Sequence, residues 1–199
     1  MSSIIATTTK FTDGAAARKM WCKDISSGPT VSVDAFNNAC GGVFIKAADI
    51  ILDDSTKRST VITCDPTNAE TWKENAEQIY VIVKDGFVMK IGGTRTGMKS
   101  RWSSYICGHH VTERGKSGKM SVTNAHLYHT IESGLLTGDK WEFYIWTIPT
   151  VTVSVDILGK MCEIKAQTYH AYESRSMSLF KTLSGGMSPT LSENCDPGY

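Results

Sequence analysis

Three polar side chains, Tyr80, Lys90 and Arg101, follow one another at intervals of ten and eleven residues. A lysine beside a tyrosine hydroxyl favours the phenolate and lowers the tyrosine pKa. A tyrosine of that kind can act as a general base near neutral pH. An arginine close to it can bind a phosphate through its planar guanidinium. The spacing therefore indicates phosphate chemistry if the three side chains meet. The alternative is a buried strand tyrosine, a solvent-exposed lysine and a surface arginine.

The elements around these residues are expected to bring them together. Residues 79–83 are apolar and mostly β-branched, and Asp85-Gly86 follows, which is a strong hairpin signal. Residues 87–92 would form the returning strand. In a hairpin closed at this turn, residues whose numbers sum to about 171 face one another, so Tyr80 and Lys90 would be near neighbours. Apolar residues at helical spacing predict a helix over 98–106, which carries Arg101.

The rest of the chain predicts an α/β (α+β) fold, with a small antiparallel or mixed sheet flanked by helices. Residues 47–52 suggest a helical turn. Residues 141–146 and 150–156 suggest strands, and residues 162–183 suggest a long helix. The pattern divides the chain at about residue 75. Residues 1–75 are expected to form an N-terminal extension, and residues 76–199 the domain that carries the candidate residues.

Charge is distributed unevenly, although the formal net charge is only +1. Residues 90–119 contain a single acidic residue, Glu113, and seven basic ones: Lys90, Arg95, Lys99, Arg101, Arg114, Lys116 and Lys119. A basic segment in an otherwise mildly acidic chain favours a polyanionic ligand. A solvated charged surface is the alternative, and charge alone does not decide between them.

Other protein classes fit less well. No apolar run has the roughly 18 residues of a membrane span, and the first residues lack the apolar block of a secretory signal. A cytoplasmic protein is therefore expected. The six cysteines include no Cys-x-x-Cys pair, which argues against a cysteine/histidine metal protein and favours reduced thiols.

Three short segments resemble the core motif of the GIY-YIG nuclease family. They are Ile79-Tyr80, then Lys90-Ile91-Gly92-Gly93-Thr94, then Lys99-Ser100-Arg101-Trp102. The resemblance covers roughly residues 78–195. Two positions depart from the family pattern: Gln78 stands where the first glycine is usual, and Lys90 replaces the second tyrosine. The lysine makes the chain most similar to the restriction-endonuclease branch.

The resemblance implies a role for each matched residue. Tyr80 would be the general base, Lys90 would assist it, and Arg101 would bind the scissile phosphate. Tyr105, one helical turn after Arg101, would lie near the attacking water or belong to the core. Glu173 would hold one Mg²⁺ ion, with Mn²⁺ as a substitute, and Glu163 is the competing carboxylate. Ser192 or Asn194 would replace a supporting asparagine of the family.

The activity implied by the resemblance is divalent-metal-dependent cleavage of double-stranded DNA, site-specific in the manner of a type II restriction enzyme. A homodimer would cut both strands of a two-fold site. Residues 1–75 would then serve DNA recognition or dimerisation. The DNA backbone would be held by basic and histidine side chains: Arg95, Lys99, His109, His110, Arg114, Lys116 and Lys119. The alternative is a non-catalytic DNA-binding protein on the same fold.

Overall fold

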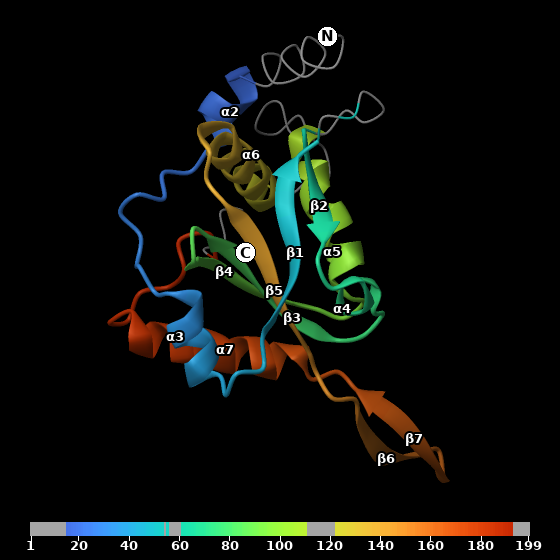
Figure 1. The fold of residues 1–199 in the computed structure, drawn as a ribbon. Helices are drawn as coiled ribbons and strands as arrows, with labels where there is room; N and C mark the ends of the chain where they lie inside the picture. The colour runs from blue at the N-terminus through green and yellow to red at the C-terminus, as the bar shows by residue number, and fades with distance from the viewer. Residues whose placement is uncertain (1–14, 54, 56–60, 111–121, 193–199) are drawn as a thin grey trace.

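A five-stranded antiparallel sheet organises the computed structural model, which describes residues 15–53, 55, 61–110 and 122–192 (Figure 1). Its strand order is β2-β1-β5-β3-β4. The strands are β1 (Ile45–Leu52), β2 (Ile62–Pro66), β3 (Gln78–Lys84), β4 (Phe87–Thr94) and β5 (Trp141–Thr147). The predicted α/β fold with a small central sheet is confirmed.

Helices cover both faces of this sheet. On one face lie α4 (Ala69–Lys73), α5 (Met98–Ile106) and α6 (Val122–Thr137), and on the other lie α3 (Val33–Ala39) and α7 (Tyr169–Leu183). Helix α2 (Ala15–Trp21) packs on α6, and a 3₁₀ turn, η1 (Cys107–His110), follows α5. Strand β3 contributes Tyr80 and Ile82 to the first core and Val81 to the second. Burial on both faces explains why its sequence is continuously apolar.

Residues before position 75 belong to the same sheet as those after it. Strand β1 pairs with β2 on one side and with β5 on the other, so Ile50 lies between Cys64 and Trp141. The N-terminal segment thus contributes two strands to the central sheet. The helical turn predicted at residues 47–52 is wrong, because this segment is strand β1, with Ala48 and Ile50 buried against the first core.

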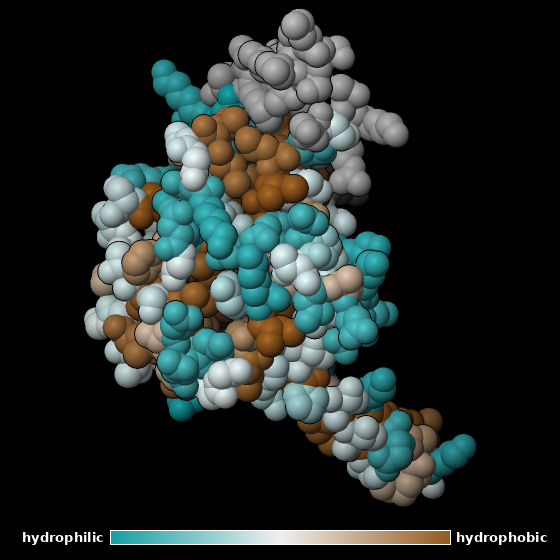
Figure 2. All heavy atoms as spheres, in the orientation of Figure 1, coloured by the Kyte–Doolittle hydropathy of each residue, from teal (hydrophilic) through white to brown (hydrophobic). Residues whose placement is uncertain are grey.

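A second hairpin extends away from the sheet (Figure 1) and carries apolar side chains on its surface (Figure 2). It consists of β6 (Val151–Ile157) and β7 (Lys160–Ala166). The helix predicted over residues 162–183 is therefore wrong in its first part, because 160–166 pair with β6 and α7 begins at Tyr169. In the ranges that the structure describes, no helix is long and apolar enough to cross a bilayer.

Candidate active site

Tyr80, Arg101 and Tyr105 meet where β3 faces α5. The hydroxyls of Tyr80 and Tyr105 are hydrogen-bonded to each other, and Arg101 Nε donates to the Tyr80 hydroxyl over 3.4 Å. The guanidinium carbon of Arg101 lies 4.6 Å from the centre of the Tyr105 ring. Both tyrosines are 1% exposed. Tyr105 is therefore a core residue and also a direct partner of Tyr80.

The position of α5 relative to β3 is fixed by a side chain that sequence analysis missed. Gln78 is fully buried at the start of β3, and its Oε1 accepts a hydrogen bond from Met98 N over 2.7 Å. Its Nε2 donates to Thr71 O (2.9 Å) and to Thr147 Oγ1 (3.2 Å). The N-cap of α5 is Gly97, which has no side chain to do this. Gln78 therefore aligns the helix that carries Arg101.

Lys90 lies diagonally across from Tyr80 on the same face of the hairpin. Tyr80 pairs with Gly92 and Ile82 pairs with Lys90, because a bulge shifts the register between Ile82 and Val83. Lys90 is 8% exposed, and its Nζ donates to Leu191 O over 2.9 Å. Tyr80 and Lys90 are thus near neighbours, as expected. The difference is that Tyr80 pairs with Gly92 and not with residue 91.

The pKa of Tyr80 shifts in the direction opposite to the expected one. Burial raises the pKa of this phenol, although the charge of Arg101 and the hydrogen bonds from Tyr105 and Arg101 act against the increase. Burial also raises the pKa of Tyr105 well above its ordinary value. The expectation that a neighbouring lysine lowers the pKa of Tyr80 is corrected: both phenols are neutral at neutral pH in the protein alone.

Glu173 approaches the same strand from helix α7, on the other face of the sheet. A Cβ atom added at Gly93 would lie 2.8 Å from Glu173 Oε2, and one added at Gly92 would collide with the Tyr80 hydroxyl. Burial raises the pKa of Glu173, while His170, Lys90, Arg101 and a backbone hydrogen bond from Gly93 act to lower it. Because Gly92 and Gly93 have no side chains, Tyr80 can approach β4 from one face and Glu173 from the other.

The outer edge of β4 is hydrogen-bonded by three residues from the C-terminal part of the chain. Leu191 N donates to Met89 O over 2.8 Å, and Ser192 Oγ accepts from Ile91 N over 3.0 Å. Glu173 accepts a hydrogen bond from the next outward-facing backbone N–H, that of Gly93. Bonding of an edge strand in this way blocks its pairing with another chain. Ser192 thus supports the strand, and Asn194 lies outside the described residues.

The remaining candidates are placed only in part. Arg95 is exposed just after β4, and Lys99 is exposed on α5. His109 and His110 belong to η1, but their side chains lie outside the described part of the structure, as do Arg114, Lys116 and Lys119. Glu163, the competing carboxylate, lies on β7 and accepts from the Ser154 hydroxyl. It is therefore on the projecting hairpin and is no alternative to Glu173.

A metal at this site would have one carboxylate ligand. Within the described residues, no group of three or more His, Cys, Asp or Glu side chains is arranged to hold a metal. Mg²⁺ is commonly bound through one or two carboxylates, waters and substrate phosphate oxygens. The donor set around Glu173 fits such an ion when a phosphate is present, since Lys90 and Arg101 both disfavour a free cation there.

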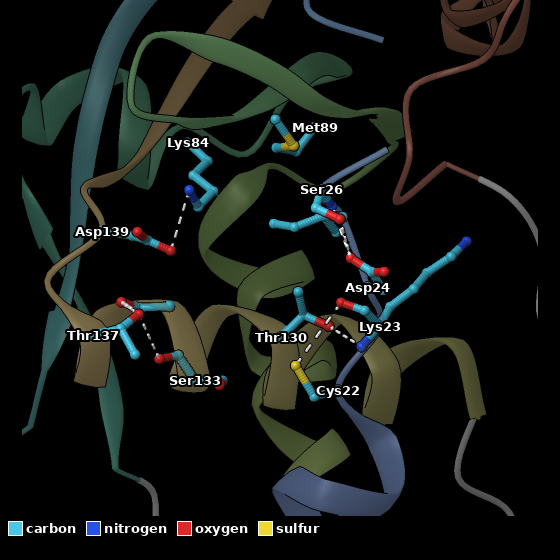
Figure 3. Close-up of a pocket in the computed structure, with 12 residues that line it drawn as sticks. Cys22, Lys23, Asp24, Ser26, Lys84, Met89, Thr130, Ser133, Thr137 and Asp139 are labelled. Carbon is cyan, nitrogen blue, oxygen red and sulfur yellow. Dashed lines mark hydrogen bonds and ion pairs between the residues drawn. The ribbon is translucent and has the colours of Figure 1, made fainter. Parts of the chain in front are cut away.

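A pocket of about 370 Å³ lies elsewhere, between α6 and the segment 22–26 (Figure 3). Its lining includes Lys23, Thr130, Lys84 and Asp139, with Lys84 Nζ 3.2 Å from Asp139 Oδ2. None of the candidate site residues lines it. The pocket is therefore separate from the Tyr80–Glu173 cluster.

No family model matches the chain, and no curated protein matches it. Among solved structures, it is similar to the restriction endonuclease HPY188I in complex with product DNA, with a TM-score of 0.55 and 19% identity over 85% of this chain and 91% of that one. It also matches a mutant of bacteriophage T4 EndoII, with a TM-score of 0.48 and 19% identity over 76% and 96% of the two chains. The first likeness shows a shared fold.

The family expected from the sequence is corrected by these comparisons. No family model supports the GIY-YIG assignment, and the likeness to HPY188I, at 19% identity, shows the fold and not a family. The short motifs are therefore not enough to assign the chain. What stands is the fold and the cluster of Tyr80, Lys90, Arg101, Tyr105 and Glu173 around the bare segment of β4.

Proposed function

We propose that this chain is a DNA endonuclease that hydrolyses phosphodiester bonds at the Tyr80–Glu173 cluster. One observation carries the proposal: a hydrogen-bonded tyrosine pair, an arginine and a half-buried glutamate converge on Gly92-Gly93. The likeness to the fold of HPY188I, which is a restriction endonuclease seen with product DNA, supports it. Exposed Arg95 and Lys99 beside the cluster supply positive charge for the DNA backbone.

In this reaction Tyr80 accepts a proton from the attacking water. The water oxygen bonds to phosphorus, the bond to the 3′ oxygen breaks, and the leaving oxygen takes a proton from solvent. Tyr80 must first release its own proton to solvent, and Arg101 favours that loss because it donates to the phenol oxygen. Arg101 also neutralises the phosphate in the transition state. Lys90 adds positive charge on the same face of the hairpin.

Glu173 is proposed as the protein ligand of one Mg²⁺ ion, which Mn²⁺ could replace. Such an ion polarises the phosphate and stabilises the leaving oxygen when bound. We further propose that cleavage is confined to a short DNA sequence and that two chains act on the two strands. Discrete fragments from a plasmid, rather than a continuous smear, would be the result expected of sequence-confined cleavage.

A non-catalytic DNA-binding protein is the second candidate. The observation that favours it is the burial of Tyr80 and Tyr105, each 1% exposed, because a general base must reach water. Under this alternative the tyrosine pair is only part of the core. Binding would still fall steeply with salt, because it would rest on basic side chains along the backbone.

The test compares two buried tyrosines of the same core. Purified chain is incubated with supercoiled plasmid and Mg²⁺, with an EDTA control, beside Tyr80→Phe, Glu173→Gln and Tyr128→Phe. Tyr128 is 2% exposed, and its hydroxyl accepts a hydrogen bond from Val61 N over 2.9 Å. Tyr128→Phe therefore removes a buried, hydrogen-bonded hydroxyl, as Tyr80→Phe does. Cleavage should fall about 10²-fold or more in Tyr80→Phe, should vanish in Glu173→Gln and EDTA, and should persist in Tyr128→Phe.

Two results would contradict the proposed roles. Equal cleavage by Tyr80→Phe and Tyr128→Phe would remove Tyr80 from the chemistry. DNA binding without cleavage by the unmodified chain, across several plasmids and both metals, would select the non-catalytic alternative. Binding is measured separately by electrophoretic mobility shift in EDTA, so that loss of affinity is not mistaken for loss of chemistry.

A further inference from the structure

A hollow of about 390 Å³ lies where three connecting parts of the chain meet. They are the segment between α4 and β3, the residues that follow β4, and the two connections that enter and leave the β6–β7 hairpin. Ala76, Ile148 and Ala166 contribute apolar side chains to its lining. Unlike the pocket of Figure 3, it includes a candidate residue, Arg95. Connecting segments held by a rigid sheet commonly carry binding residues, so this hollow is a candidate binding site.

The hollow is also lined by four exposed, long polar side chains: Asn75, Arg95, Lys165 and Gln167. None of these four side chains has a hydrogen-bond or ion-pair partner among the residues that the structure describes. The carboxylate of Glu77, by contrast, is already bonded to Thr168. Donors and acceptors that gather around one hollow and remain unpaired within the chain are available to a ligand.

Glu77 holds two sides of the hollow together. Its Oε2 accepts hydrogen bonds from Thr168 N over 2.9 Å and from Thr168 Oγ1 over 3.0 Å. Its backbone oxygen accepts from Ile148 N over 2.9 Å. Gln167 is the residue before Thr168, and Asn75 lies two residues before Glu77. The two carboxamides therefore reach one hollow because their segments are bonded to each other.

A glycine brings the third side, which carries Arg95, against the first. Gly97 has φ +84°, and a Cβ atom added there would collide with the backbone oxygen of Glu74. Any side chain at this position would push apart the segment after β4 and the segment that carries Asn75. The close approach of these two segments therefore requires glycine, both for its φ and for the space.

The distance from the hollow to the proposed active site fits the spacing of nucleotides in a DNA strand. Arg95 lies two residues after Gly93, about 7 Å along an extended chain. Gln167 lies six residues before Glu173, about 9 Å at the rise of a helix. One nucleotide adds about 3.4 Å of rise. A strand with its scissile phosphate at the cluster therefore has a base about two or three nucleotides away at the hollow.

The types of side chain distinguish the reading of a base from binding to the backbone. Arg95 and Lys165 are positively charged and have only donors, which suits phosphate oxygens. Asn75 and Gln167 are uncharged, so they add nothing to the attraction for phosphate. Each carboxamide presents a donor beside an acceptor, the pattern that matches N6 and N7 of adenine, and its donor also suits O4 of thymine. The two carboxamides thus favour contact with a base pair.

We propose that Asn75 and Gln167 determine part of the sequence specificity by reading one A·T base pair of the bound DNA, while Arg95 and Lys165 hold the backbone beside it. One base pair is assigned because the two carboxamides share one hollow. The inference rests on the proposed function, since DNA bound at the cluster is what brings a base pair to the hollow. It requires binding and not cleavage, so the two can be tested separately.

The test is selection of DNA by binding. The full chain is mixed with short duplexes of randomised sequence in EDTA, the bound fraction is separated by mobility shift, and the recovered DNA is sequenced. The unmodified chain should enrich an A·T pair at one position about tenfold or more over the other pairs. Asn75→Ala and Gln167→Ala should each lose most of this preference and keep the preferences at other positions. Sequencing of the ends cut in Mg²⁺ should place the pair about two or three nucleotides from the cut.

Two further variants are controls. Asn38→Ala removes an exposed carboxamide from α3, which does not line the hollow, and should keep the preference. Arg95→Ala should weaken binding to all sequences alike and reduce its dependence on salt. An unmodified chain that selects no sequence, or Asn75→Ala and Gln167→Ala proteins that keep the A·T preference or weaken all sequences alike, would overturn the proposal. Selection of the pair by a chain that cuts no plasmid would overturn the proposed cleavage and support this assignment.

Discussion

The two hairpins of this chain have nearly the same turn and opposite surroundings. β3 and β4 are joined by Asp85 (φ +49°) and Gly86 (φ +83°), and β6 and β7 by Leu158 (φ +54°) and Gly159 (φ +83°). Both turns use two left-handed residues, the geometry that matches the twist of paired strands. Yet β3 is almost wholly buried, and every residue of β6 is exposed.

The difference lies in what holds each turn. Asp85 exchanges hydrogen bonds with Lys140, since Asp85 N donates to Lys140 O and Asp85 Oδ1 accepts from Lys140 N, each over 2.9 Å. Two hydrogen bonds therefore hold the β3–β4 turn against the residue before β5. The β6–β7 turn is closed within its own hairpin, by Asp156. The first hairpin thus suits a fixed site, and the second suits a contact made outside the chain.

The largest effect expected from this comparison is at the β3–β4 hairpin, where Arg101 contacts Tyr80. Arg101→Ala should lower kcat for DNA nicking by about 10²–10³-fold, because it removes the positive charge that stabilises the negative charge developing on the phosphate. Ser103→Ala, on the exposed side of the same helix, is the control. Single-turnover nicking of a supercoiled plasmid by gel measures both.

A smaller effect is expected at Gln78, where the site hairpin meets α5. Gln78→Leu leaves Met98 N, Thr71 O and Thr147 Oγ1 without this partner. The free energy of unfolding should fall by about 3 kcal/mol, the cost of buried groups left unbonded. Urea denaturation followed by circular dichroism gives this value.

Gln78→Glu is the matched variant, because its carboxylate keeps the acceptor for Met98 N and loses only the two donations. If Gln78 positions α5, kcat should recover in Gln78→Glu more than stability does, with KM little changed in both. Parallel recovery of kcat and stability would mean that the residue acts only on folding.

Sequence reasoning succeeded where local signals and tertiary packing agree. The β3–β4 hairpin has an Asp-Gly turn and a buried apolar strand, and the helix predicted over 98–106 is α5 with these bounds. The same reasoning failed at residues 47–52, because a short apolar run does not distinguish a helical turn from a buried strand. It missed the β6–β7 turn because Leu-Gly is a poor turn signal.

The residues of the candidate site could be named from the sequence. Their exact register and contacts could not. A bulge between Ile82 and Val83 shifts Lys90 by one place, and no local pattern in the sequence indicates a bulge there. Gln78 stands where a glycine was expected, and this departure was the available signal of its role. The direction of the Tyr80 pKa shift depends on burial, which its position in an apolar strand already indicated.

The turns themselves provide the smallest prediction. Asp85→Leu gives the β3–β4 hairpin the turn sequence of the β6–β7 hairpin, and it should lower the free energy of unfolding by about 1–2 kcal/mol, the cost of a left-handed conformation for such a residue. The loss of the Lys140 contact contributes to the same change. Thermal unfolding followed by circular dichroism measures it. A change near zero would show that tertiary contacts, and not the turn residue, set the conformation of both hairpins.

Asp85→Asn separates the turn conformation from its charge. Asparagine tolerates the left-handed region and keeps an acceptor for Lys140 N, so only the pairing with Lys84 is lost. Because Lys84 and the Lys140 amide lower the pKa of Asp85, its ionised form adds stability above its ordinary pKa, and this stability is lost as pH falls through the lowered value. Stability near neutral pH should therefore change by less than about 0.5 kcal/mol, since the pair is exposed. The difference between Asp85→Asn and the unmodified chain should shrink further in acid. A difference that grew in acid would assign the role of Asp85 to something other than its charge.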